Sequence, residues 1–452
     1  MDIPKNINKY LNNYAIDSNW PLTSRSLDNI ENVVVIPALA EKNSLFKTLA
    51  CLAGNPPHEL NSTLVLCVIN NREKHIAPQE DIVNNQETIE LLKHIIRRNS
   101  QNFLINSPFK DDLKQIYQSD LRLACLDASS PGLEMPEKNG RVGMARKIGM
   151  DWALRIFDYE KSGPQLIFSL DGDTLVEKIY LSSVRNFFEK ENKIAGVIAF
   201  HHQDAKNLPL QIAICCYEIF LYYYVLGLSY AGSYYAFHSI GSAMVCNAVG
   251  YAAVRGMNRR EAAEDFYFLD KLAKIQPIGR INSTRVYPSA RPSRRTPFGT
   301  GQRIIRFMEG KQNEYLLYNP QVFWVLKQWL DLMSPGTKMT FQKISALAKE
   351  IHPSLDIFLK AYNFNRIWPR LLANSRTSSS LARQFLYWFD GFKTLKLIRY
   401  LTENGLPPVE MFTALKQLLQ MMGKDIPPGI DFGKTPGLDI QLNILEYLRN
   451  LP

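Results

Sequence analysis

Continuous apolar runs that alternate with helical patterns constrain this fold more than any other feature of the sequence. The run NVVVIPAL, residues 32–39, is rich in β-branched side chains and shows no alternation of apolar and polar residues. Such a run predicts a strand that is buried on both faces, as in a parallel sheet. The segment that follows, residues 41–54, spaces its leucines as an amphipathic helix does and ends at a glycine.

The same alternation continues to about residue 200. We expect further buried strands at 62–71, 121–129, 164–173 and 193–202, and a helix at 142–157. Strands that alternate with helices are typical of an open α/β sheet covered by helices. From about residue 310 onward, helical patterns are separated by proline, glycine and serine turns, with no convincing strand signal. We therefore predict an N-terminal extension over 1–30, an α/β domain over 31–309 and an all-helical region over 310–452.

Composition narrows the classes of function. The chain has 452 residues, 46% of them hydrophobic and 21% charged, which argues against wholesale disorder. Its six cysteines include no CxxC pair, so we expect neither a disulfide framework nor a zinc cluster. The formal net charge of +10 favours anionic partners such as nucleotides, phosphates, anionic lipid or nucleic acid, without choosing among them. We expect no nucleic-acid partner, because the basic loop at 289–303 lacks an interleaved aromatic platform.

One long apolar stretch, residues 208–237, has nearly the length of a membrane span. Glu218 lies within it and glycine and serine interrupt it, so we expect a buried or membrane-surface helix in preference to a transmembrane one. The polar N-terminus has no apolar signal region. We therefore expect a cytoplasmic protein, with peripheral contact to the inner face of the membrane as an open alternative.

The stretch FSLDGDTLV, residues 168–176, leads from a predicted strand into two aspartates one residue apart. Burying two close carboxylates is unfavourable unless a cation compensates them, and Mg²⁺ or Mn²⁺ binds carboxylates together with water and phosphate oxygens. Asp171 and Asp173 are therefore candidate metal ligands, and Asp171 could instead contact the ribose of a nucleotide. A solvated turn, in which aspartate and glycine are common, is the alternative.

Other polar residues are placed to meet these aspartates. Pro37, Asn70 and Asp127 fall at predicted strand ends, and ligands of open α/β sheets bind beyond the carboxyl ends of the strands. Glu264 and Asp265 begin a predicted helix, where the helix dipole favours a carboxylate. Such a carboxylate can also act as a general base that takes a proton from an attacking hydroxyl.

Two further segments carry candidate ligand contacts. Gly241 and Ser242 either allow a close backbone approach to a ligand or form a plain turn. A basic loop follows later, with Arg291, Arg294 and Arg295 among prolines and glycines. Forked guanidinium groups suit a diphosphate and could neutralise the charge on a leaving nucleotide, although many basic loops are only solvated surface.

In this order, the motifs resemble those of family 2-type glycosyltransferases with a GT-A fold. The resemblance covers roughly residues 30–305 and rests on VVVIPALAE, VINN, GMARKIGMDWAL, SLDGDTLV, GSAMVCNAVGYAAVRGM, AAEDFYFLDKL and RPSRRTPFGTG. It implies a Rossmann-like, mostly parallel open sheet with helices on both faces. It also implies transfer of a sugar from a nucleotide-diphosphate sugar to an acceptor hydroxyl, with Mg²⁺ or Mn²⁺ as cofactor. The acceptor could be a sugar, a glycerate-like molecule or a lipid-linked hydroxyl.

Carried over to this sequence, the resemblance assigns a role to each candidate residue. Asp171 and Asp173 would bind the metal, and Asp265, with Glu264 beside it, would be the base of an inverting displacement, with a retaining displacement as the alternative. The acceptor side would be bordered by Gly241 and Ser242. The donor would contact Pro37, Ala38, Glu41, Asn70, Arg146, Lys147 and Asp171, and its diphosphate would contact Arg291, Arg294 and Arg295.

The sequence departs from the family pattern at two places. Asn70 and Asn71 stand where the family usually has an aspartate for a uracil-type base, and an amide, which both donates and accepts, can prefer another base. No histidine follows Asp265 until His352, so water or another group could complete the metal shell. A non-catalytic or regulatory nucleotide-sugar-binding protein is the alternative function. A sugar-phosphate nucleotidyltransferase is less favoured, because PALAEKNSL contains no glycine to hold a triphosphate.

Overall fold

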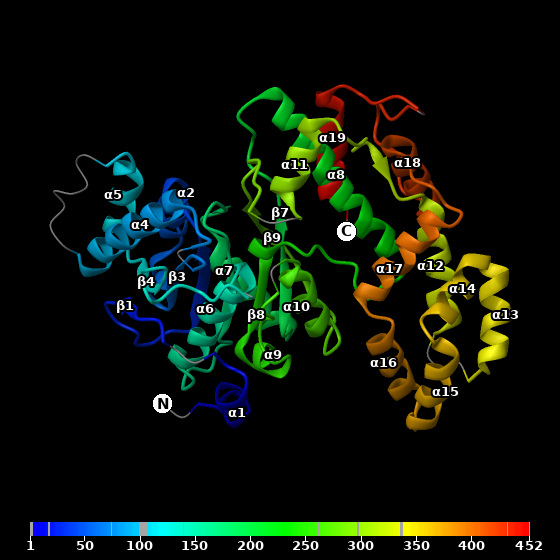
Figure 1. Ribbon diagram of the computed structural model, residues 1–452, viewed down its shortest axis with the longest axis horizontal. Coiled ribbons are helices and arrows are strands. Elements are labelled where there is room, and N and C mark those ends of the chain that lie inside the picture. The colour runs from blue at the N-terminus through cyan, green and yellow to red at the C-terminus, as the bar shows by residue number, and fades with distance from the viewer. Residues whose placement is uncertain are drawn as a thin grey trace. The chain divides into compact units, whose positions relative to one another are not determined.

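The computed structural model (Figure 1) describes residues 3–16, 19–73, 75–98, 107–138, 140–260, 262–295, 298–334, 338–431 and 433–451. It divides into two compact units. Unit 1 comprises Met1–Gln203, Ser239–Ser289 and Arg295–Phe298, and unit 2 comprises Asp204–His238, Ala290–Arg294 and Gly299–Pro452. This division differs from the predicted boundaries, because residues 204–238 cluster with the C-terminal helices and the first 30 residues cluster with the sheet.

Unit 1 contains a nine-stranded mixed sheet, within the described residues, in the order β1-β4-β3-β2-β5-β8-β7-β9-β6. Its strands are β1 (Leu22–Ser24), β2 (Asn32–Ala38), β3 (Thr63–Asn70), β4 (Arg122–Ala128), β5 (Leu166–Ser169), β6 (Leu175–Val176), β7 (Ala195–Phe200), β8 (Met244–Asn247) and β9 (Gly279–Tyr287). Strands β2, β3, β4, β5, β7 and β9 run in one direction, and β1, β6 and β8 run in the other. The predicted fold class, an open and mostly parallel α/β sheet, is confirmed.

Helices cover the centre of this sheet. Every residue of β2 and β3 is buried, and side chains of a strand alternate between its two faces, so both faces are covered. Helix α6 (Val142–Ile156) packs on β2 and β3, and α4 (Gln79–Arg97) packs on β3 and β4. Gly149 permits the close approach of α6, because a Cβ atom there would overlap the side chain of Val35.

The remaining helices of unit 1 lie at the strand connections and at the N-terminus. They are α1 (Lys5–Asn13), α2 (Lys42–Ala53), α3 (Pro57–Asn61), α5 (Lys110–Gln118), α7 (Tyr180–Glu191), α9 (Ala248–Ala253), α10 (Glu264–Ala273) and the 3-10 turn η2 (Gly241–Ala243). The helices predicted at 41–54 and 142–157 are confirmed as α2 and α6.

Unit 2 is a helical bundle. Its helices are α8 (Leu208–Tyr230), α11 (Thr300–Glu309), α12 (Pro320–Leu332), α13 (Phe341–Ile351), α14 (Pro353–Ala361), α15 (Phe364–Asn374), α16 (Ser378–Trp388), α17 (Gly391–Glu403), α18 (Met411–Met421) and α19 (Leu438–Arg449). The prediction of an all-helical region is confirmed apart from two short strands, β10 (Leu316–Leu317) and β11 (Val409–Glu410), which pair antiparallel. Its core includes the fully buried Trp329, Phe323 and Phe364.

Helix α8 corresponds to the apolar stretch in the sequence. Within the described residues it is the one helix long and apolar enough to cross a membrane, and 56% of its most apolar window is buried inside the protein. Glu218 in this helix is buried and pairs with Arg449 of α19 at 2.8 Å.

Candidate active site

Four neighbouring parallel strands end at one edge of the sheet, and the acidic turn follows one of them. Val35 of β2 is the register partner of Ser169 of β5, and the Leu170 N–H donates to the Val35 carbonyl at 3.1 Å. Pro37 and Ala38 end β2 on this edge, and Asp171-Gly172-Asp173 begins one residue after that hydrogen bond. The strands therefore place the acidic turn beside the carboxyl end of β2.

Glu41, just before α2, connects this turn to the arginine loop. A Cβ atom on Gly172 would lie 3.3 Å from the Glu41 side chain, so the glycine allows close packing. Glu41 is buried and forms an ion pair with Arg295, whose Nη2 also donates to the Ala40 carbonyl at 3.2 Å. Of the three predicted loop arginines, Arg295 is thus the one that unit 1 brings to the acidic turn.

Arg146 is the centre of the site. It projects from α6 and is only 3% exposed. Its Nη2 donates to Asp171 Oδ1 at 2.5 Å, its Nε donates to Ser169 Oγ at 3.1 Å, and its Nη1 pairs with Glu264. One guanidinium therefore joins the end of β5 to the first turn of α10.

Small residues make room for this bridge. A Cβ atom on Gly143 would overlap the carbonyl oxygens of Arg260 and Asn258, so the glycine lets α6 begin directly against the segment that leads into α10. Gly241 packs against the Arg146 guanidinium itself. The next residue, Ser242, is 1% exposed, and its hydroxyl has no hydrogen-bond partner within the part of the chain that the structure describes.

The negative charges close to Arg146 outnumber its single positive charge. Burial acts to lower the pKa of the Arg146 guanidinium, but Asp171, Glu264 and Asp265 outweigh burial and raise it. Burial, followed by the charge of Glu264, raises the pKa of Asp265 to about 7, although Arg146 opposes the shift. These three carboxylates share one buried guanidinium. The cluster that they form can therefore take up a proton, or a further cation, near neutral pH.

Asp171 and Asp173 supply the oxygen ligands that Mg²⁺ or Mn²⁺ prefers. The Asp171 side chain is 37% exposed and that of Asp173 is half-buried, so both can be reached. Across the described ranges, no group of three or more His, Cys, Asp or Glu side chains is arranged to hold a metal ion. Asp171 and Asp173 are therefore the residues that would hold such an ion.

Asn70 and Asn71 are buried at the end of β3, where an unpredicted residue organises them. Asn85 of α4 donates through Nδ2 to the Asn70 carbonyl and to Asn71 Oδ1, both at 3.0 Å. The Oδ1 of Asn85 accepts from the Ala40 N–H at 2.8 Å. Asn85 therefore ties the loop after β2 to the loop after β3. Nothing in its helical context distinguishes it in the sequence.

Lys147, adjacent to Arg146, lies in a different cluster. Its Nζ is 2.6 Å from Tyr10 Oη and 3.1 Å from Asp151 Oδ2. Asp151 also accepts from Tyr10 Oη at 2.6 Å and from Tyr251 Oη at 2.7 Å. The structure thus places the Lys147 ammonium in a buried network with α1 and α9, and a donor contact for Lys147 stays a prediction.

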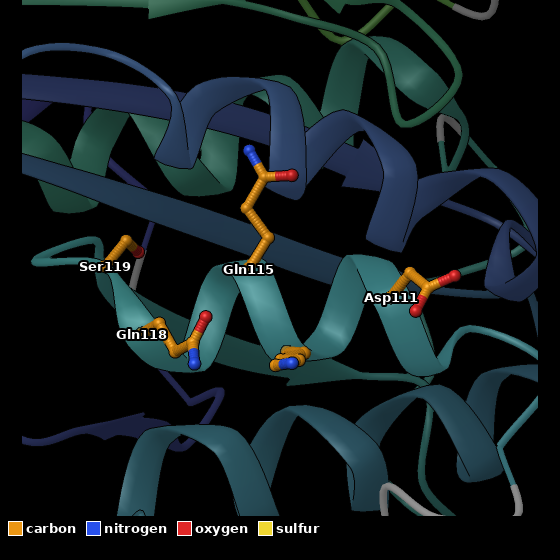
Figure 2. Close-up of a pocket in the computed structure, with 5 residues that line it drawn as sticks. Asp111, Gln115, Gln118 and Ser119 are labelled. Carbon is orange, nitrogen blue, oxygen red and sulfur yellow. The ribbon is translucent and has the colours of Figure 1, made fainter.

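Two of the predicted diphosphate ligands lie outside unit 1. Arg291 and Arg294 belong to unit 2, where Arg294 pairs with Glu309 at 3.7 Å. A hollow of about 440 Å³ lies beside α5, and none of the predicted site residues lines it. Figure 2 shows the residues that do. The lining of the hollow consists of Asp111, Lys114, Gln115, Gln118 and Ser119.

No family model matches the chain, and no curated protein matches it in sequence. Among solved structures, it is similar to TarS 1-349 from S. aureus, with 10% identity and a TM-score of 0.35 over 93% of this chain and 89% of that one. The same protein in complex with UDP-GlcNAc aligns at 11% identity and a TM-score of 0.34, over 93% and 90%. The mannosyltransferase PcManGT from Pyrobaculum calidifontis, in complex with GDP-Man and Mn²⁺, gives 11% identity and 0.34, over 85% and 92%. At TM-scores this low the likeness carries no functional argument for this chain.

Proposed function

We propose that this chain is a glycosyltransferase of the GT-A type, which moves a sugar from a nucleotide-diphosphate sugar to an acceptor hydroxyl. The observation that supports it most strongly is the bridge that Arg146 makes between Asp171, after β5, and Glu264, at the start of α10. An inverting, metal-dependent transfer of this kind uses an acidic turn that holds the metal and a carboxylate base close to it. The two motifs that supply them are far apart in sequence and share one buried charge network.

Asp265 is the residue that we assign as general base. A carboxyl whose pKa is raised to about 7 is partly ionised at neutral pH and is basic enough to accept a proton from a hydroxyl. The acceptor oxygen forms a bond to the anomeric carbon as its proton passes to Asp265. The bond from that carbon to the diphosphate oxygen breaks, and its electron pair leaves on the diphosphate. Attack opposite the leaving group inverts the configuration.

We assign donor binding to residues that lie at the edge of the sheet where the parallel strands end. Asp171 and Asp173 would hold Mg²⁺ or Mn²⁺, which when bound neutralises charge on the diphosphate. Arg295, which pairs with Glu41, offers a second cation for the same oxygens. The buried hydroxyl of Ser242 has no hydrogen-bond partner among the residues that the structure describes, and we assign Ser242 to the acceptor side of the site.

The first test is a thermal-shift screen of nucleoside diphosphates and nucleotide-sugars with Mn²⁺, because a ligand specific to the folded protein raises its melting temperature. With the donor identified, Asp265→Asn should lower turnover by about 100-fold or more while the donor-induced shift is kept. Asp439→Asn is the matched control, since Asp439 also lies in the first turn of a helix but is exposed in unit 2. Asp173→Ala should remove the Mn²⁺-dependent part of the shift.

The outcomes separate the parts of the proposal. Unchanged turnover in Asp265→Asn would rule out its role as base, while leaving donor binding intact. A donor that binds without any turnover, with or without acceptors, would point to a binding protein. A screen in which no nucleotide or nucleotide-sugar raises the melting temperature would overturn the proposal as a whole.

A further inference from the structure

The hairpin formed by α15 and α16 in unit 2 carries a concentrated positive charge. Residues 361–389 contain four arginines and no acidic residue. These are Arg366 and Arg370 in α15, Arg376 in the connection and Arg383 in α16. The two helices pack against each other at one end of unit 2 (Figure 1), so the four charges belong to one local surface.

All four arginines are exposed, and within the described residues none forms an ion pair or a side-chain hydrogen bond. Arg366 and Arg370 are four residues apart on α15 and therefore project from the same helix face. Neither α15 nor α16 has an acidic residue in its first turn, where helices commonly carry one. Within the hairpin itself, no carboxylate compensates the four guanidinium groups.

The nearest acidic residues lie on neighbouring helices or just after the hairpin, outside residues 361–389. Helices α13 and α14 pack on α15 and contribute Glu350 and Asp356. Asp356 is buried and pairs with Lys360 at 2.6 Å. Asp390, which follows α16, caps α17 by accepting from the Lys393 N–H at 3.0 Å. Unpartnered guanidinium groups with this spacing have the chemistry to bind several phosphate groups at once.

Exposed apolar side chains accompany the arginines. Tyr387 is 45% exposed and lies four residues after Arg383, hence on the same face of α16. Ile357 is 53% exposed on α14, which packs on α15. Aromatic and aliphatic side chains beside arginines suit the boundary between lipid headgroups and acyl chains. An aliphatic side chain gains little against a nucleic-acid backbone, which binds through charge and base stacking.

We propose that the α15–α16 hairpin is a docking surface for an anionic lipid bilayer, in which the four arginines bind lipid phosphates and Tyr387 enters the headgroup layer. Basic residues near an anionic membrane surface contribute to binding additively, and salt screens the attraction. The surface lies wholly within unit 2, so the inference is independent of the chemistry proposed for unit 1.

The test is co-sedimentation of the full-length protein with vesicles of phosphatidylcholine alone or of phosphatidylcholine with phosphatidylglycerol. We expect binding to the anionic vesicles alone, with release as salt is raised. Replacing Arg366, Arg370, Arg376 and Arg383 together by Gln should lower vesicle affinity by about tenfold or more. The matched control replaces the same number of basic residues in unit 2 but outside the hairpin, namely Lys311, Lys338, Lys424 and Lys434, by Gln, and should change affinity by less than about threefold.

Two further measurements keep the proposal open to refutation if the fourfold glutamine variant fails to fold. The fourfold Arg→Lys variant keeps the charge and should bind more weakly than the natural protein but more tightly than the glutamine variant. Amide hydrogen exchange of the natural protein should slow in peptides covering 364–388 when anionic vesicles are added. Failure of the natural protein to bind anionic vesicles, equal losses in hairpin and control variants, or binding of single-stranded RNA in preference to vesicles would each overturn the proposal.

Discussion

Gly241 lies against the guanidinium of Arg146, and the space between them leaves no room for a Cβ atom. Gly241 begins the short turn before β8, and β8 pairs with β5, whose Ser169 also contacts Arg146. The backbone that enters the neighbouring strand thus packs on the same cation that Asp171 and Glu264 hold. The absence of a side chain at position 241 is therefore part of how the site is built.

Gly241→Ala should impair turnover more than stability. A Cβ atom at this position would come within 2.8 Å of Arg146 Cζ, so the guanidinium has to shift. Small misplacements of a catalytic array can cost up to about 100-fold in rate, and we expect a loss of about tenfold or more in kcat/KM. Gly437→Ala is the control, because nothing lies within 4 Å of a Cβ atom there. Full activity in Gly241→Ala would show that the position of Arg146 does not matter to turnover.

The pH dependence of turnover should report Asp265. The base has to be ionised, and the pKa of Asp265 is raised to about 7, mainly by burial and by Glu264. We therefore expect kcat/KM to rise with pH and to level off above about pH 7. A profile that is flat from about pH 5 to about pH 8 would contradict the assignment of this carboxyl as the base.

The same shift has a consequence for stability with the opposite sign. Because the pKa in the folded protein lies above the ordinary value of 3.8, folding takes up a proton between about pH 4 and about pH 7. The stability that Asp265 contributes is thus present at low pH and is lost as pH rises through this window. Asp265→Asn, which has no charge to bury, should gain stability relative to the natural protein over the same window. Denaturant unfolding of both proteins at several pH values provides the comparison.

The strands that could be predicted from the sequence are those that are buried along almost their whole length. Strands β2, β3 and β4 consist almost wholly of buried residues, and their continuous apolar runs reveal them without knowledge of their partners. Strand β8 has only four residues and follows a glycine-containing turn, so no comparable run marks it. It is a strand because it pairs antiparallel with β5 and β7, and such tertiary pairing is not encoded in local pattern.

The side chains of the candidate site could likewise be predicted only in part from the sequence. Asp171, Glu264 and Asp265 could be chosen from their motifs, because ligands of such sheets bind beyond the strand ends and a carboxylate at a helix start can act as a base. The adjacent basic residues of α6 could not be told apart, since successive helix residues point about 100° from each other. The structure resolves the pair: Arg146 meets the carboxylates of the site, and Lys147 meets Asp151.

Removing the Arg146 charge should destabilise the fold and uncouple the two motifs. Arg146→Met leaves the buried Glu264 without its cation, and breaking a buried pair in this way costs about 3–5 kcal/mol. Arg146→Met combined with Glu264→Gln should cost less than the sum of the single changes, because the second change removes the charge that the first leaves unpaired. Denaturant unfolding of the four proteins gives the coupling energy, and strict additivity would contradict a direct interaction.

Lys147→Met separates a structural role for this lysine from a contact with the donor. Lys147 is buried in contact with Tyr10 and Asp151, and burial lowers the pKa of its ammonium. Loss of the ammonium should lower the free energy of unfolding by about 3 kcal/mol, since Asp151 then keeps only neutral hydrogen-bond donors around a buried charge. Lys327→Met is the control, because its pair with Asp331 has the same i,i+4 spacing but both side chains are exposed, so we expect about 1 kcal/mol or less. Donor affinity, measured by titration at a temperature where both variants are folded, should be unchanged in each. Weakened donor binding by Lys147→Met with unaltered stability would instead place its ammonium on the nucleotide.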